Sequence, residues 1–162
     1  MDNPDRPVTI ITGGTRGIGA ATAIRLALAG HDLALAYRQD DSAAQQTAAR
    51  VQDAGARCVL VKADVTRERD VERLFSVTAD QLGMVTGLVN NAGATIHIGD
   101  LTDTPVDLIR QVIDVNFLGV VLCARQAGKV MSVRRGGHGG AIVNVSSAAA
   151  ALGSPRRPAP RG

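Results

Sequence analysis

The sequence predicts a three-layer α/β fold, in which helices cover both faces of a doubly wound parallel sheet of about five strands. Five short runs rich in Val, Ile, Leu and Ala recur along the 162 residues, and they are mostly continuous rather than alternating. Strands that are buried on both faces of a parallel sheet have this character. Helical patterns separate the runs, and the repeated strand–helix order favours right-handed crossovers. We expect the strand order 3-2-1-4-5 and a sheet that is incomplete on its C-terminal side.

A glycine closes each of the first three predicted helices. Gly30 suits a left-handed C′ position, and Gly55 and Gly83 follow the other two helices. Thr66 is expected to cap the third helix. The predicted strands are 8–12, 32–37, 57–62, 87–90 and 141–146, and these helices are 17–29, 42–54 and 67–82.

A longer helical pattern covers residues 105–131 and carries two apolar stripes. Thr104 is expected to cap this helix, with Pro105 at its first position. One stripe holds Val106, Ile109, Ile113, Phe117 and Val120, and the other holds Leu108, Val112, Val115 and Leu122. A surface helix needs only one stripe, so one face is expected to pack on the sheet and the other on a second subunit. The sequence therefore favours a homo-oligomer through this helix.

Length and composition indicate one domain with an aliphatic core. The aromatic side chains among the 162 residues are Tyr37, Phe75 and Phe117. The net charge of +3 comes from three arginines within residues 156–162, because without them 15 basic residues balance 15 acidic ones. No basic patch interleaved with aromatic residues remains, so nucleic-acid binding is not expected.

Metal and membrane functions are also disfavoured. Cys58 and Cys123 stand alone in apolar runs, as small core residues of a reducing compartment do. The histidines at 31, 97 and 138 show no metal-ligand spacing. No segment reaches the roughly 18 apolar residues of a membrane span, and the start of the chain is charged. We expect a soluble cytoplasmic protein with no metal site.

The segment 12–19, TGGTRGIG, lies between the first predicted strand and the first helix. Glycines there let the chain turn sharply and bring backbone N–H groups close to a pyrophosphate, and the helix N-terminus adds partial positive charge. The spacing is G-x-x-x-G-x-G rather than the commoner G-x-G-x-x-G fingerprint. In its strand–helix–strand setting, the segment predicts a phosphate-binding loop.

The end of the second predicted strand favours NADP(H) over NAD(H). An acidic residue at that place would bind the ribose 2′-hydroxyl of NAD. The strand ends instead at Arg38, which would meet a 2′-phosphate, and Arg16 of the glycine loop lies within reach of it. The alternative is that Arg38 is a solvated loop charge, with Asp40 or Asp41 capping the next helix.

Four motifs, in this order and spacing, resemble the short-chain dehydrogenase/reductase family. They are the glycine loop at 12–19, NNAG at 90–93, Asn116 in the fourth helix and VSS at 145–147. The match runs from residue 8 to about 155 and is similar to 3-oxoacyl-carrier-protein reductases and to sugar or alcohol dehydrogenases. It implies a partial Rossmann-type dinucleotide-binding domain over residues 1–155, followed by a Pro- and Arg-rich tail, 156–162, that is expected to be disordered.

The resemblance also implies roles for single residues. Asn116 would hold a water molecule in a proton relay. Ser147 would bind the substrate oxygen, with Ser146 as the alternative that the family's spacing disfavours. Asp64 would contact the adenine, although it also fits a supporting role beside the Thr66 cap. The cofactor-binding residues implied are Gly13, Thr15, Arg16, Gly17, Ile18, Gly19, Arg38, Asp64, Val65, Asn91, Ala92 and Gly93.

The family pattern breaks near the end of the chain. The family places a tyrosine, its general acid/base, roughly 13 or 14 residues after the serine, and a lysine four residues later. Pro160 and Arg161 occupy the tyrosine positions, and the chain's one tyrosine is Tyr37. Loss of a positioned acid/base costs about 10²–10⁴ in rate. We therefore expect a truncated or frame-shifted product whose own turnover is weak or absent.

The predicted function is an NADP(H)-dependent oxidoreductase that interconverts a small alcohol and a ketone or aldehyde. The alternative is a non-catalytic NADP(H)-binding fragment, either inert or acting on full-length partners by subunit exchange through the fourth helix. Both hypotheses predict binding of NADPH, and only the first predicts its consumption. The identity of the substrate stays open.

Overall fold

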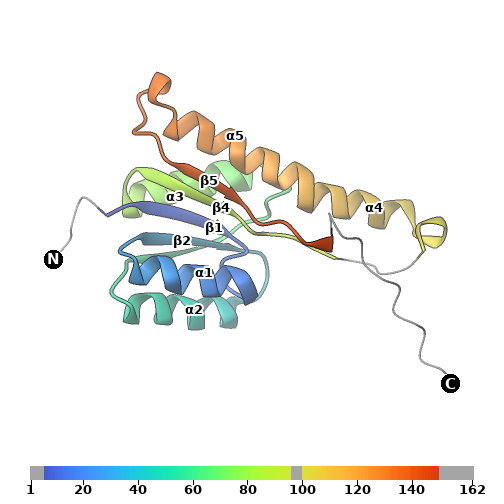
Figure 1. The fold of residues 1–162 in the computed structure, drawn as a ribbon, viewed down its shortest axis with the longest axis horizontal. Coiled ribbons are helices and arrows are strands. Elements are labelled where there is room, and N and C mark those ends of the chain that lie inside the picture. Colours follow the sequence, from blue (N-terminus) through green and yellow to red (C-terminus); the bar gives the residue numbers. More distant parts are fainter. Residues whose placement is uncertain (1–5, 96–99, 150–162) are drawn as a thin grey trace.

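The computed structural model describes residues 6–95 and 100–149, and within them five parallel strands form one sheet (Figure 1). The strands are β1 (Val8–Thr12), β2 (Asp32–Tyr37), β3 (Cys58–Lys62), β4 (Val85–Asn90) and β5 (Ala141–Asn144). Their order is β3-β2-β1-β4-β5, and each neighbouring pair is parallel. The predicted fold class and strand order are confirmed. The predicted tail, 156–162, lies outside the described residues.

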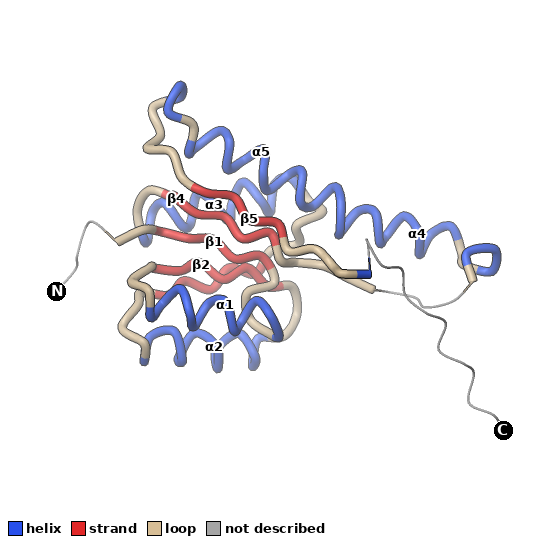
Figure 2. The backbone as a smooth tube through the Cα atoms, in the orientation of Figure 1, coloured by secondary structure: helices blue, strands red, loops and turns tan. Residues whose placement is uncertain are grey.

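Helices cover the sheet on both faces. On one face lie α1 (Gly17–Leu28) and α2 (Asp41–Asp53), and on the other lie α3 (Glu68–Leu82) and α5 (Gly119–Met131) (Figure 1). The helix α4 (Val106–Ile113) joins α5 through η2 (Asp114–Leu118), and Figure 2 shows that this helical run extends beyond the sheet at its α4 end. Short turns are η1 (Leu101–Asp103) and η3 (Val133–Arg135). The predicted bounds of the strands and of the first three helices agree with the structure to within two residues.

The core consists of two aliphatic clusters, one on each face of the sheet. The cluster beneath α3 and α5 includes Leu74, Phe75 and Cys123, which are at most 2% exposed. The cluster beneath α1 and α2 includes Leu33 and Leu35, which are fully buried. Because parallel strands are covered on both faces, β1 and the first five residues of β2 are buried without alternation, as the continuous apolar runs predict.

The predicted caps Thr66 and Thr104 are wrong, and the structure decides between the two candidates for the cap of α2. Asp40, one of two candidates, caps α2, since its Oδ1 accepts a hydrogen bond from the backbone N–H of Ala43 at 3.0 Å. The hydroxyl of Thr66 donates to Asp64 at 2.8 Å instead of capping α3. The hydroxyl of Thr104 donates to the carbonyl oxygen of Asp100 at 2.8 Å, and Pro105 stands at the N-cap of α4.

The helical run over 106–131 packs on the sheet mainly through a face that neither predicted stripe describes, although Leu122 of the second stripe is partly buried against the core. Its buried residues are Gly119, Cys123, Ala127 and Met131, and α4 buries none. These four recur every fourth residue, three of them are small, and they let α5 lie close to β4. The predicted stripes missed this face because glycine and alanine contribute little to an apolar pattern. Large apolar residues of the stripes stay exposed, among them Phe117 at 67%.

The β5 strand lies at an edge of the sheet. It pairs with β4, and in the order of the described strands nothing lies beyond it. Its apolar side chains Ile142 and Val143 are 42% and 53% exposed. Among the described strands β5 is therefore an edge strand, as the predicted strand order requires.

A buried carboxylate at the start of β2 ties three segments together. Asp32 is 0% exposed and accepts hydrogen bonds from the backbone N–H and the Nε of Arg57, at 2.9 Å and 2.7 Å. A second cation is Arg6, whose Nε lies 3.4 Å from Oδ1 of Asp32. The Nη2 of Arg57 also donates to the carbonyl oxygen of Leu82 at 2.9 Å. Asp32 therefore joins the starts of β2 and β3 to the end of α3.

Candidate functional site

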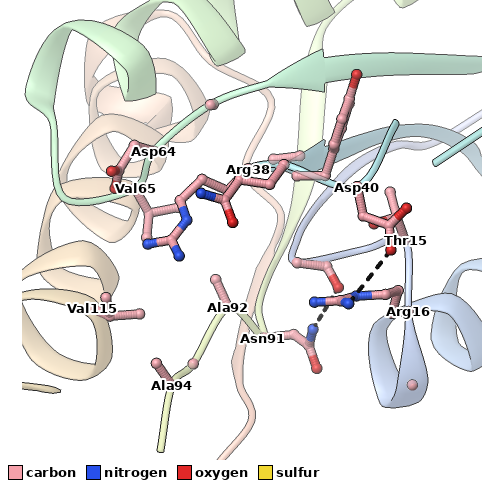
Figure 3. A pocket seen from close by; sticks show the side chains of 17 residues that line it. Thr15, Arg16, Arg38, Asp40, Asp64, Val65, Asn91, Ala92, Ala94 and Val115 are labelled. Atoms are coloured by element: carbon pink, nitrogen blue, oxygen red, sulfur yellow. Dashed lines mark hydrogen bonds and ion pairs between the residues drawn. The ribbon is translucent and has the colours of Figure 1, made fainter. Parts of the chain in front are cut away.

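A cavity of about 630 Å³ lies at the carboxyl ends of β1, β2, β3 and β4 (Figure 3). In a doubly wound sheet, ligands bind at this edge, where the strand order reverses. The lining residues are Gly13, Thr15, Arg16, Gly17, Ala36, Tyr37, Arg38, Gln39, Asp40, Ala63, Asp64, Val65, Asn91, Ala92, Gly93, Ala94 and Val115. All the predicted cofactor-binding residues are among them except Ile18 and Gly19.

The glycine loop forms the cavity wall beside β1 and α1. Gly13 and Gly17 have φ values of +62° and +50°, a conformation that side chains rarely adopt. A Cβ on Gly13 would lie 3.1 Å from the Cα of Ala92, so the two backbones approach closely. A Cβ on Gly17 would meet nothing within 4 Å, which leaves open space at the N-terminus of α1. This is the geometry that a pyrophosphate requires.

Gly19 and Ile18 lie in α1 outside the cavity lining. A Cβ on Gly19 would collide with the carbonyl oxygen of Gly13 and lie 2.6 Å from the Nδ2 of Asn91. Gly19 therefore permits α1 to begin directly against the glycine loop. The side chain of Ile18 is 65% exposed. A contact of Ile18 with cofactor stays a prediction.

The NNAG segment holds the glycine loop from the side of β4. The hydroxyl oxygen of Thr12 accepts hydrogen bonds from the backbone N–H groups of Asn91 and Ala92, both at 3.0 Å. The Nδ2 of Asn91 donates to the carbonyl oxygens of Thr12 and Gly13, also at 3.0 Å each. The ends of β1 and β4 are therefore locked together at the floor of the cavity.

Two arginines and two acids bring charge to the cavity. Nη1 of Arg16 lies 3.5 Å from Oδ2 of Asp40, a pair that Figure 3 marks. Arg38 extends across the cavity toward Asp64 and Val65 (Figure 3). The cavity therefore contains both arginines that the sequence analysis predicted to bind a 2′-phosphate. It also contains the carboxylate of Asp40, which the sequence analysis considered only as a helix cap.

Asp64 is held in a turn at the end of β3. Its Oδ1 accepts hydrogen bonds from the backbone N–H of Thr66 at 3.0 Å and from the hydroxyl of Thr66 at 2.8 Å. Its own backbone N–H donates to Asp70 at 2.9 Å. Partial burial raises the pKa of Asp64, but the bonds from Thr66 and the charges of Arg38 and Arg67 outweigh it and leave that pKa below its ordinary value.

Asn116 fixes the loop that follows NNAG. Its Oδ1 accepts a hydrogen bond from the backbone N–H of Ala94 at 2.9 Å, and its Nδ2 donates to the carbonyl oxygen of Ala94 at 2.8 Å. Asn116 lies in η2, a π-helical turn, and such wide turns are frequent at functional sites. The amide of Asn116 thereby positions Gly93 and Ala94, which line the cavity.

Ser147 lies in the segment after β5 and outside the cavity lining. It is exposed, and its Oγ accepts a hydrogen bond from the backbone N–H of Ala149 at 3.2 Å. A role for Ser147 toward substrate stays a prediction. Several lining residues were not found by sequence reasoning, and the clearest are Asp40, Ala94 and Val115. Asp40 had one signal, its place two residues after Arg38.

The part of the chain that the structure describes contains neither a candidate metal site nor a candidate membrane-spanning helix. In residues 6–95 and 100–149, no cluster of three or more His, Cys, Asp or Glu side chains could hold a metal ion. Within the same ranges, no helix is long and apolar enough to cross a membrane.

The fold and the cavity together define a class of protein, the dinucleotide-binding α/β domains. The glycine cradle, the open N-terminus of α1 and the basic side chains beside β2 fit such a cofactor. The chain belongs to the short chain dehydrogenase family, whose sequence model matches residues 7–159. The resemblance seen in the four sequence motifs is confirmed.

Relatives in this family share most of the chain. It is 39% identical over 148 residues to the uncharacterised oxidoreductase YgfF of Escherichia coli, and 34% identical over 148 residues to a 3-oxoacyl-[acyl-carrier-protein] reductase of Synechocystis. Each match covers 91% of this chain, and 60% and 58% of the relative, respectively. An L-rhamnose 1-dehydrogenase (NAD(P)(+)) of Sphingomonas is 35% identical over 144 residues, covering 89% of this chain and 56% of the relative. The chain therefore spans less than two thirds of the length of these relatives.

Solved structures show the same fold. NAD⁺-bound xylitol dehydrogenase superposes with a TM-score of 0.85 at 30% identity, covering 92% of this chain and 56% of that one. A short-chain type dehydrogenase/reductase of Mycobacterium marinum superposes with a TM-score of 0.79 at 31% identity, covering 85% of this chain and 54% of that one.

Proposed function

We propose that this chain binds NADP(H) in the cavity and supplies the cofactor-binding part of an oxidoreductase that interconverts a small alcohol and a ketone or aldehyde. The observation that carries the proposal is the presence of Arg16 and Arg38 in one cavity with the glycine cradle. Guanidinium groups bind phosphate through paired donors, and the residue that directly follows β2 is Arg38 rather than an acid that would bind a ribose hydroxyl.

The names of the relatives support a nicotinamide cofactor without choosing between its forms. The Sphingomonas relative is described with NAD(P)(+), and the xylitol dehydrogenase structure holds NAD⁺. The preference for NADP(H) therefore rests on the two arginines of this chain.

Binding to the 162-residue chain tests the proposal. Isothermal titration with NADPH and with NADH should show binding of both, with NADPH tighter by about threefold to tenfold. The 2′-phosphate alone distinguishes the two ligands, so each serves as the other's control. If neither NADPH nor NADH binds, the proposal is contradicted. If NADH binds more tightly than NADPH, the choice of cofactor is contradicted.

The bound nicotinamide ring would accept or supply a hydride, and the residues of this chain would orient the reactants. Asn116 would keep Gly93 and Ala94 in place along the cavity. Ser147 would donate a hydrogen bond to the substrate oxygen, and Asn116 would order a water molecule for proton transfer. Replacement of Ser147 by alanine should leave the dissociation constant of NADPH unchanged, because Ser147 lies outside the cavity lining.

A non-catalytic NADP(H)-binding chain is the second candidate. The one tyrosine of the 162 residues, Tyr37, donates a hydrogen bond to Asp41 at 2.8 Å. This bond raises the pKa of Tyr37 above its ordinary value, so the phenol is not prepared to exchange protons at neutral pH. The purified 162-residue chain should therefore bind NADPH without consuming it in the presence of small carbonyl compounds. Steady oxidation of NADPH would favour the enzyme over the binding chain.

We also propose that the helical run over 106–131 forms a contact between two copies of the chain. Its outward side exposes large apolar side chains, including Val106 at 60%, Ile113 at 51% and Phe117 at 67%. Contiguous apolar surface of this kind is typical of interfaces. Sedimentation equilibrium should show a dimer or larger species, and Phe117→Glu should shift it toward the monomer. Leu28→Glu, a change at a 71% exposed position in α1, is the control.

A further inference from the structure

A fixed carboxylate shares the cavity with the two arginines. Asp40 lines the cavity together with Arg16 and Arg38, and its Oδ2 lies 3.5 Å from Nη1 of Arg16 (Figure 3). The side chains of Asp40 and Arg16 are 41% and 74% exposed, so the pair is in contact with solvent and can open. A cofactor phosphate that reaches Arg16 must therefore compete with Asp40.

The position of Asp40 is set by the start of α2. Its Oδ1 accepts a hydrogen bond from the backbone N–H of Ala43 at 3.0 Å, which caps the helix. The partial positive charge of the helix N-terminus also attracts a carboxylate group at this position. The two carboxylate oxygens of Asp40 thus have different partners, because Oδ1 caps α2 and Oδ2 faces Arg16. The carboxylate cannot turn away from the cavity without losing the cap.

We propose that Asp40 is a specificity-determining residue that opposes the 2′-phosphate of NADPH and so narrows the preference for NADPH over NADH. The inference rests on the proposed binding of NADP(H) in this cavity. A phosphate that carries nearly two negative charges is repelled by a fixed carboxylate, and it must also separate Arg16 from Asp40. NADH carries a hydroxyl at the same place, so neither cost applies to it.

Two neutral substitutions test the role of the charge without removing the cap. Asparagine and serine are N-caps of similar quality to aspartate, so Asp40→Asn and Asp40→Ser should keep α2 intact. Titration of the 162-residue chain at low ionic strength should show that each variant binds NADPH about threefold to tenfold more tightly, with NADH changed less than about twofold. Asp53→Asn makes the same change of charge at the other end of α2 and should leave the NADPH-to-NADH ratio unchanged.

A second background separates repulsion from competition for Arg16. In an Arg16→Gln chain, the partner of Asp40 is missing, so the gain from Asp40→Asn should shrink but not vanish. Thermal unfolding of every variant, followed by circular dichroism, reports whether the fold is kept.

The outcomes distinguish this inference from the function on which it rests. If the unmodified chain binds neither cofactor, the proposed function fails and the inference fails with it. If the chain binds NADPH and Asp40→Asn leaves both affinities unchanged, or changes them equally, only the inference is overturned. Weaker binding of NADH alone would also overturn it, since Asp40 would then contact the ribose hydroxyls.

Discussion

Asn91 donates two hydrogen bonds to Thr12, each 3.0 Å long. The backbone N–H of Asn91 donates to the hydroxyl oxygen of Thr12, and the Nδ2 of Asn91 donates to the carbonyl oxygen of Thr12. The first glycine of the loop, Gly13, is held by the same side-chain amide. The shape of the loop before any ligand arrives is therefore set by a residue that lies 79 positions beyond Thr12, directly after β4.

Asn91→Ala should weaken both the fold and the binding of NADPH. The variant leaves the carbonyl oxygens of Thr12 and Gly13 without their donor, and loss of such a partner costs about 1–3 kcal/mol of unfolding free energy. Urea denaturation measures the loss, and titration should show weaker binding of NADPH and NADH alike. Gln52→Ala, on the exposed side of α2, is the control and should stay within about 0.5 kcal/mol. An unchanged urea midpoint for Asn91→Ala would contradict the locking role.

Arg38→Gln should affect the two cofactors differently. The substitution removes a charge-assisted contact to a 2′-phosphate, which is worth about 1.5–3 kcal/mol, so NADPH should bind at least about tenfold more weakly. The affinity for NADH should change little. Arg50→Gln removes an exposed charge of α2 outside the cavity lining and serves as the control. Equal weakening of both cofactors would assign Arg38 to the adenine rather than to the phosphate.

Gly19→Ala should disrupt the cradle, whereas the same change at Gly128 should be tolerated. A Cβ at position 19 would collide with the carbonyl oxygen of Gly13, but one at position 128 meets nothing within 4 Å. Overpacking of this kind costs about 1–3 kcal/mol, and an alanine in the interior of α5 gains about 0.5–1 kcal/mol. Thermal unfolding and titration with NADPH check both variants. Retention of full affinity by Gly19→Ala would show that the loop can shift.

Asp32→Asn should destabilise the fold strongly and act far from the cavity. The carboxylate is fully buried, but the side chains of Arg57 and Arg6 are 41% and 24% exposed and can be hydrated, so loss of the charge-assisted hydrogen bonds should cost about 1.5–3 kcal/mol. Asp53→Asn changes the same charge at an exposed position and should be nearly neutral. Denaturation by urea measures both. A loss below about 1 kcal/mol for Asp32→Asn would mean that the arginines find other partners.

The two thiols should make the fold less stable in alkali. Burial raises the pKa of Cys58 to about 11 and that of Cys123 to about 12, from an ordinary value of 9.0. Above pH 9 the unfolded chain therefore releases thiol protons that the folded chain retains, and the free energy of unfolding falls, by at most about 1.4 kcal/mol per pH unit for each thiol. Urea midpoints between pH 8 and pH 11 measure this decline, and Cys58→Ala should flatten it.

The sheet could be predicted from the sequence because helices cover both faces of its parallel strands. Strands that are buried on both faces have continuous apolar runs. The glycine loop was also predictable, since its positive φ angles and close contacts admit little else. The packed face of α5 was not predictable in this way. It depends on Gly119, Ala127 and their neighbours, whose small side chains matter through the close approach they permit.

The charged part of the site was predicted incompletely for a different reason. Arg16 is recognised by its place in the glycine loop and Arg38 by its place at the end of the second strand, whereas Asp40 is held at the cavity by the cap that it forms with Ala43. The sequence also did not reveal that the amide of Asn116 contacts both backbone groups of Ala94, and the role of Asn116 toward a water molecule stays a prediction. Such contacts depend on where loops meet in space, which spacing along the chain does not give.

The chain contains no tryptophan, and its one tyrosine lines the cavity. Ultraviolet emission excited in the tyrosine band therefore comes from a single phenol, Tyr37, at the end of β2. Its hydroxyl lies 2.8 Å from the carboxylate of Asp41, and it shares the cavity wall with Arg38. Any ligand that settles beside β2 alters the surroundings of the only intrinsic fluorophore of this class that the molecule has. The fluorescence of Tyr37 should therefore report the binding of a ligand in the cavity, and no label has to be attached to the protein.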